Sequence, residues 1–170
     1  MLAYSGTTNG RPQTGYVKLN GVAVWQGAWH VVNISNLRGV NTILIHPFNC
    51  SVQESRQFDT HGSTDAATKL SNYLQLLNHG SIIVGVSADE PIRYLTNATS
   101  TLQLLGADIS DVLPRGSFGF IAQKGFPSKT VLRKALTLAE SNSQQPYINA
   151  IVTGTQRAVA YASSVDIYSS

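Results

Sequence analysis

Cysteine and charged side chains are both scarce in this chain of 170 residues. Because Cys50 is the single cysteine, the chain cannot form an intrachain disulfide or a thiolate metal cluster. Charged residues make up 12% of the sequence, against ~25% in an average domain. The net charge is +3 and the basic residues are scattered, so they do not form the basic stripe that is typical of a nucleic-acid-binding protein. No apolar run is long enough to span a membrane. We therefore expect one domain over residues 1–170, without nucleic-acid binding or membrane insertion.

The sequence also lacks the common catalytic and cofactor motifs. It has no G-x-S-x-G elbow, no H-E-x-x-H pair, no glycine-rich phosphate loop and no dinucleotide fingerprint. Asp59, Thr60 and His61, together with Asp65, could form an acid–base or metal group. The favoured interpretation is that Asp59 and Thr60 end a strand and form a turn that leads into a helix. Calcium needs several convergent oxygen ligands, and only Asp59, Asp89 and Glu90 are candidates. We therefore expect no enzyme activity, no cofactor and no metal site.

Two features of the sequence bear on the cellular compartment. N-x-S/T triplets begin at Asn33, Asn49 and Asn97, and they mildly favour secretion. Such triplets also arise by chance in a chain rich in Asn, Ser and Thr. Residues 1–4 do not begin a signal peptide. The residues alone therefore leave two alternatives: an intracellular protein, or one whose leader was removed before residue 1.

The middle of the chain predicts the unit around which the rest is organised. Its apolar runs alternate with turn signals, and one segment repeats apolar residues at helical spacing. The expected elements are a hairpin of residues 40–45 and 52–58, a helix from Ser63 or Thr64 to Leu77, and a strand at 81–87. If this unit is the core, the fully buried residues should include Ile43, Ile45, Leu70, Leu74, Ile83 and Val86.

The flanks of this unit supply further hairpins and helices. Asn20-Gly21, between two β-rich runs, is a strong hairpin signal because both residues tolerate positive φ. A third helix is expected from residues 127–128 onward, with Val131, Leu132, Ala135, Leu136 and Ala139 on one face. The other expected elements are a loosely ordered arm at 1–14, strands at 16–19, 22–25, 29–34 and 117–122, a helix at 97–105, and a closing hairpin of 147–153 and 158–162. The expected class is α+β: a compact β-sandwich-like domain of two mostly antiparallel sheets, with about three short helices packed outside.

Several short sequence pieces, in order and at consistent spacing, resemble an ILEI/PANDER-like domain. The pieces are Arg38-Gly39-Val40-Asn41, Phe58-Asp59-Thr60, Asp89-Glu90-Pro91, Leu105-Gly106, Arg115 followed by Phe118, and Lys124-Gly125. The family is named for interleukin-like EMT inducer and pancreatic-derived factor. A similar domain forms the stem of the protein O-mannose N-acetylglucosaminyltransferase. The resemblance covers roughly residues 15–140. Each piece alone is unspecific, and the signal lies in the order and spacing of the pieces.

This resemblance implies a function and a compartment. Members of the family are extracellular or lumenal, and the stem domain binds carbohydrate through an Arg–Asp–Arg set that falls on Arg38, Asp89 and Arg115. The cytokine-like members carry paired cysteines, whereas this chain has only Cys50. The resemblance therefore implies a secreted, metal-independent, lectin-like domain whose partners are glycans or glycoproteins, with a homo-oligomer allowed. The alternative is a secreted cytokine-like signalling ligand that binds a receptor protein; Pro91 matches those members.

The predicted strand order brings the same residues together. Arg38 precedes the strand that begins at residue 40, Asp89 follows the strand that ends at 87, and Arg115 precedes the strand that begins at 117. If the strand at 81–87 is antiparallel to the other two, all three residues lie at one edge of the sheet. We therefore expect a shallow polar pocket of Arg38, Asp89 and Arg115, with Glu90 at its rim. Its guanidinium and carboxylate groups would bind sugar hydroxyls.

Overall fold

A computed structural model describes residues 15–19, 22–27, 38–137, 139–140, 148–153 and 157–162 of the protein. Its centre is a five-stranded sheet in the order β4-β3-β5-β6-β7, in which every pair of neighbours is antiparallel. The strands are β3 (Gly39–Ile45), β4 (Val52–Phe58), β5 (Ile82–Ala88), β6 (Ser117–Gln123) and β7 (Val131–Ala135). The predicted central hairpin and the strand after its helix are therefore confirmed.

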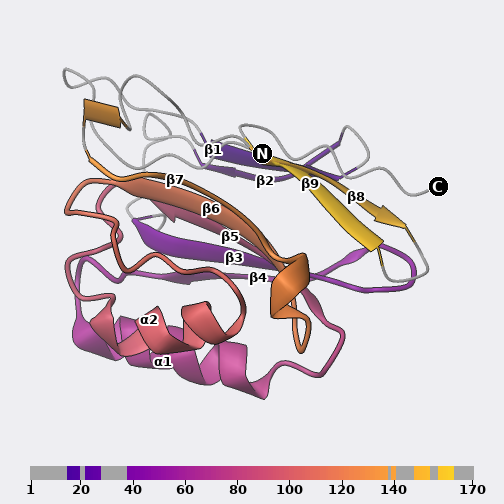
Figure 1. Ribbon diagram of the computed structural model, residues 1–170, viewed down its shortest axis with the longest axis horizontal. Helices are drawn as coiled ribbons and strands as arrows, with labels where there is room; N and C mark the ends of the chain where they lie inside the picture. Colours follow the sequence, from indigo (N-terminus) through magenta and orange to yellow (C-terminus); the bar gives the residue numbers. More distant parts are fainter. Residues whose placement is uncertain are drawn as a thin grey trace.

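Two α-helices cover one face of this sheet (Figure 1). Their bounds are Thr64–Leu76 for α1 and Thr96–Leu104 for α2. The first helix begins where the sequence predicts because the Ser63 hydroxyl accepts a hydrogen bond of 3.2 Å from the Ala66 amide. A buried hydrogen bond of 2.7 Å joins the hydroxyls of Ser71 and Thr101, so the two helices are linked by polar as well as apolar contacts.

Two short hairpins lie on the other side of the sheet (Figure 1). Each is an antiparallel pair. The pairs are β1 (Gly15–Leu19) with β2 (Val22–Gly27), and β8 (Ile148–Thr153) with β9 (Arg157–Ala162). Val17 is fully buried, and Val24 and Trp25 pack against the same apolar cluster. Both predicted hairpins are confirmed, whereas the predicted arm at 1–14 and strand at 29–34 lie outside the described residues.

The core has two apolar layers, one on each face of the sheet. Strand alternation sends successive side chains to opposite faces, so Ile83 packs with Leu70 and Leu74 under the helices. Val86 joins Ile43 and Ile45 on the hairpin side. All six residues predicted for the core are 0% exposed. Burial on both faces explains why β5 reads as an apolar run rather than as an alternating pattern.

One feature of the predicted architecture is wrong, and another is not confirmed. The expected third helix is a 3-10 turn at Pro127–Lys129 followed by strand β7. Its apolar residues fit a strand equally well, because Val131 packs on the hairpin face while Leu132 packs on the helix face. Strand β7 pairs with β6. If residues 131–135 formed a helix instead, the N–H and C=O groups on that side of β6 would lose these hydrogen-bond partners. The described strands also form one large sheet with two separate hairpins, not the two sheets of a sandwich. The class remains α+β.

Candidate functional site

The loops that carry the predicted site lie at one end of the central sheet. In the register of β3 with β5, Gly39 is opposite Ala88, so Arg38 and Asp89 extend from neighbouring strand ends. On the other side of β5, the Phe118 amide donates a 2.8 Å hydrogen bond to the Ser87 hydroxyl. This places the start of β6, and Arg115 before it, at the same end. The predicted antiparallel arrangement is therefore confirmed; carbohydrate binding by these residues stays a prediction.

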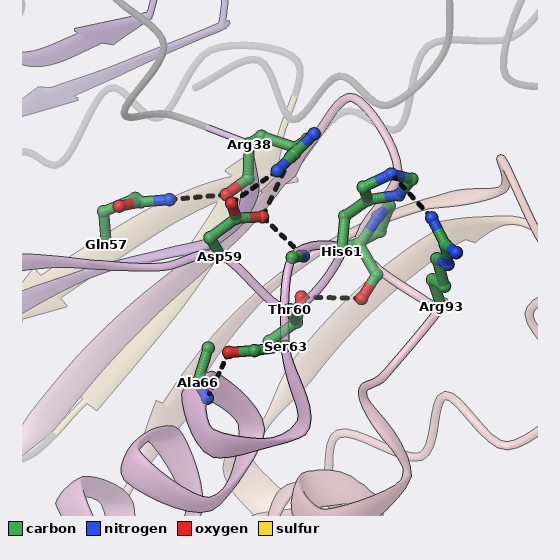
Figure 2. Close-up of polar contacts among 10 residues, drawn as sticks. Arg38, Gln57, Asp59, Thr60, His61, Ser63, Ala66 and Arg93 are labelled. Atoms are coloured by element: carbon green, nitrogen blue, oxygen red, sulfur yellow. Dashed lines mark hydrogen bonds and ion pairs between the residues drawn. The ribbon is translucent and has the colours of Figure 1, made fainter.

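Arg38 forms a paired interaction with Asp59, which follows β4. Its Nε donates to Asp59 Oδ1 at 2.9 Å, and its Nη2 donates to Asp59 Oδ2 at 2.6 Å. The Arg38 carbonyl oxygen accepts a 2.6 Å hydrogen bond from Gln57 Nε2, so the backbone of Arg38 is held as well (Figure 2). Two parallel N–H···O bonds fix the guanidinium plane. The pair therefore presents an oriented cation and anion at the sheet end.

The charges at this end perturb one another. The hydrogen bond from Arg38 holds the pKa of Asp59 below its usual range, against the opposing effect of burial. The same bond raises the pKa of Arg38, and the negative charge of Asp89 adds to this increase. Asp89 therefore contributes to the negative electrostatic environment of Arg38, after the larger effect of Asp59.

Asp59 also shapes the loop that leads to α1. Its Oδ1 accepts a 2.9 Å hydrogen bond from the Gly62 amide, and its carbonyl oxygen accepts from the amides of Gly62 and Ser63. The predicted turn at Asp59 is thus confirmed. The buried Thr60 hydroxyl donates to the Pro91 carbonyl at 2.7 Å. This bond joins the 59–63 and 89–95 loops, so the turn that carries Asp59 is tied to the loop that carries Asp89.

Close packing at Gly39 makes this arrangement dependent on glycine. Its φ is +97°, and an added Cβ would lie 2.1 Å from the Phe58 carbonyl oxygen and 2.6 Å from the Thr60 amide nitrogen. L-residues with a side chain rarely adopt this backbone conformation. Glycine therefore lets the chain run tightly past the 58–60 turn, directly after Arg38.

Two of the predicted site residues have unusual backbone angles. Asp89 has φ 55° and Arg115 has φ 63°, both in the left-handed region that non-glycine residues seldom occupy. Aspartate tolerates this conformation better than arginine does. Such strain costs on the order of 1–3 kcal/mol per residue and concentrates at functional sites. Arg115 is exposed and Asp89 partly exposed, so both side chains are accessible to a ligand.

Glu90 does not lie at the rim, so this part of the prediction is wrong. It is only 7% exposed, and its Oε1 accepts a 3.2 Å hydrogen bond from the Ile92 amide. Its carboxylate therefore supports the 89–95 loop that carries Asp89. The physical reason is local: the Glu90 carboxylate folds back onto the peptide N–H two residues on, and this hydrogen bond offsets part of the cost of burying a polar group.

Sequence reasoning missed Asp59 as the partner of Arg38. A signal was available, because the register of the predicted hairpin pairs Val40 with Phe58. That pairing places the residue before β3 near the residue after β4. The exposed pair of Arg93 Nη1 and His61 Nε2, 3.4 Å apart, was also not predicted. It lies beside the same loops (Figure 2).

Within the described ranges, no three His, Cys, Asp or Glu side chains are grouped so that they could hold a metal ion. No helix there combines the length and apolar character needed to cross a membrane.

Comparison with protein families gives one match. Residues 38–126 match the family described as interleukin-like EMT inducer. The matched segment begins at Arg38 and includes Asp59, Asp89 and Arg115, so it contains the whole sheet end described above. A search of curated proteins finds no match to the chain.

Proposed function

Because the chain belongs to the interleukin-like EMT inducer family, we propose that it is a secreted, cytokine-like recognition domain that binds a receptor protein. The family match is the observation that carries this proposal, and it reverses the order of the two functions that the sequence alone suggested. We further propose that the domain catalyses no reaction. The sheet end supports this view, because it supplies oriented charges and no nucleophile paired with a base.

We assign binding to the sheet-end surface, defined as Arg38, Asp59, Asp89 and Arg115. Arginine is enriched among the residues that dominate protein interfaces, and charges of both signs favour a specific orientation of the partner. The pairing of Arg38 with Asp59 lowers the entropy lost on binding, since both side chains are already oriented. These features fit a receptor surface of complementary charge.

The scarcity of cysteine does not argue against membership in the family. Cys50 is 3% exposed and packs in the apolar cluster on the hairpin side of the sheet. The fold is supported by two apolar layers around a continuous ladder of five strands. A domain of this size can bury enough apolar surface to fold without disulfides.

Carbohydrate binding is the second candidate, and the backbone strain at Asp89 and Arg115 favours it. The carboxylate of Asp89 and the guanidinium of Arg115 lie at adjacent strand ends on strained backbone, and such a pair would suit the paired hydroxyls of a sugar. Arg38 uses Nε and Nη2 for Asp59, and toward the other described residues its Nη1 makes no hydrogen bond, so we assign the Nη1 donors to a ligand. Under this alternative the partners are glycans or glycoproteins, and no metal is needed.

One experiment separates the two candidates. Fluorescently labelled protein is titrated onto cultured cells that have been left untreated, treated with protease, or treated with glycosidases, and the same protein is applied to a glycan array. A protein receptor predicts saturable binding that protease abolishes and glycosidases leave unchanged, with no response on the array. A lectin predicts a patterned array response and loss of cell binding after glycosidase treatment. Absence of saturable binding in every arm would reject both.

A further inference from the structure

Strand β4 forms one edge of the central sheet. Among the described strands it has β3 as its single neighbour, and Val52, Gln53, Ser55 and Arg56 are exposed. A groove of about 770 Å³ lies between this edge and α1, and Glu54, Arg56 and Tyr73 are among its lining residues. Helix α1 therefore leaves both the backbone edge and the charged side chains of β4 accessible.

The sequence of β4 is complementary to itself when read in the antiparallel direction. The strand is Val-Gln-Glu-Ser-Arg-Gln-Phe. A two-fold axis at Ser55 would place Glu54 opposite Arg56 of a second copy, and Arg56 opposite its Glu54. The same axis would place glutamine opposite glutamine at the next positions outward. Opposite charges that directly face each other stabilise antiparallel strands.

The backbone of β4 has the orientation that this pairing needs. The Thr42 hydroxyl of β3 donates a 3.4 Å hydrogen bond to the Arg56 carbonyl, so this carbonyl faces into the sheet. Because backbone groups of successive residues in a strand point to opposite sides, the N–H and C=O of Ser55 face outward. Ser55 can therefore exchange two hydrogen bonds with Ser55 of a second copy, which is the arrangement that a two-fold axis at this residue requires.

The charged side chains already lie together on one face. Arg56 Nε is 2.5 Å from Glu54 Oε1, and the Arg56 guanidinium lies 4.6 Å from the centre of the Tyr73 ring. Residues two apart on a strand share a face, so pairing would bring the two Glu54–Arg56 pairs into one network of four charges. Stacking on Tyr73 holds Arg56 near the position that the network needs.

We propose that β4 is a homodimer interface, in which the β4 strands of two copies pair antiparallel about Ser55. The register shift at Gln53 shortens the regular ladder, and the residues are polar, so the dimer should be weak and dependent on concentration. The proposal does not depend on the function of the sheet-end surface. A dimer would carry two such surfaces, which would strengthen attachment to a cell through avidity.

Charge reversal on β4 tests the proposal. Glu54→Arg places like charges opposite each other in the dimer, and so does Arg56→Glu. Sedimentation velocity over a range of protein concentrations should show monomer–dimer exchange for the parent. Each single variant should show a dissociation constant weaker by about tenfold or more. An equimolar mixture of the two variants should regain dimer, because their β4 charges are then complementary. The intrachain Glu54–Arg56 contact cannot produce this rescue by mixing.

Arg133→Glu is the matched control, because Arg133 is exposed on β7 at the opposite edge of the sheet. It should dimerise like the parent, and circular dichroism should show that every variant is folded. A parent that remains monomeric at all concentrations would overturn the proposal. The charges of β4 and its register shift at Gln53 would then serve only to prevent pairing with other strands. A dimer that survives both single reversals would equally overturn it, because the interface would then lie elsewhere.

Discussion

The ion pair between Arg38 and Asp59 makes a prediction that can be worked through from its geometry. Asp59→Asn keeps an oxygen that can accept from the Gly62 amide but removes the charge that Arg38 contacts at two atoms. The two side chains are 37% and 36% exposed, so solvent screens much of the attraction. We therefore expect a loss of about 0.5–1 kcal/mol in the free energy of unfolding, near the upper end for exposed pairs because the contact is paired.

Asp59→Ala should cost more, because it also removes the acceptor for the Gly62 amide. A hydrogen bond of this kind contributes roughly 1 kcal/mol, so the total loss should be about 1.5–2 kcal/mol. Urea unfolding at pH 7 and low ionic strength measures both variants against the parent. The difference between parent and Asp59→Asn should shrink with added salt.

The pH dependence follows from the lowered pKa of Asp59. A carboxyl group with a depressed pKa in the folded state contributes stability above its unfolded pKa, and this stability is lost as pH falls through the folded pKa. The stability difference between parent and Asp59→Asn should therefore be full at neutral pH and should decline below pH ~4. Equal stability of the two proteins at pH 7 in low salt, or a difference that grows in acid, would refute the reasoning.

Three further predictions concern the fold around the site. Leu74→Ala should lower the free energy of unfolding by roughly 2–5 kcal/mol in urea titrations, because this α1 side chain is fully buried in the cluster between the helices and the sheet; a loss below about 1 kcal/mol would contradict its place in the core. Gly39→Ala should cost at least about 2 kcal/mol, since the residue has φ +97° and an added Cβ would collide with Phe58; an unchanged melting temperature would count against this. Burial raises the pKa of the Cys50 thiol, so a thiol reagent at pH 8 should react much faster with urea-unfolded protein; equal rates would show that the thiol is accessible in the folded state.

The parts of the fold with a clear local pattern could be predicted from the sequence. The hairpin of β3 and β4 follows from two β-rich runs around a turn, and α1 follows from Ser63 and the spacing of Leu70 and Leu74. Strand β7 could not be predicted, because its apolar residues fit both a helix and a strand. Pairing with β6 decides between them, and that pairing depends on distant parts of the chain.

The site was predictable at the level of the backbone and less so at the level of side chains. The order of strands was enough to place Arg38, Asp89 and Arg115 at one end of the sheet. The contact of Arg38 with Asp59 depends on the exact hairpin register, and the burial of Glu90 depends on a local turn. The left-handed backbone at Arg115 has no sequence signal, because arginine is not a residue that favours that conformation.

Binding by variants of the sheet-end surface tests the central claim most directly. Labelled parent, Asp89→Asn and Arg115→Gly are titrated onto the cells and glycans that the parent binds, with Arg133→Ala as the control at the far edge of the sheet. Both changes suit a left-handed backbone, so lost binding would not reflect unfolding. We expect the dissociation constants of the two variants to rise by about tenfold or more, with the control unchanged. Parent-like binding by both variants would contradict the assignment of this surface.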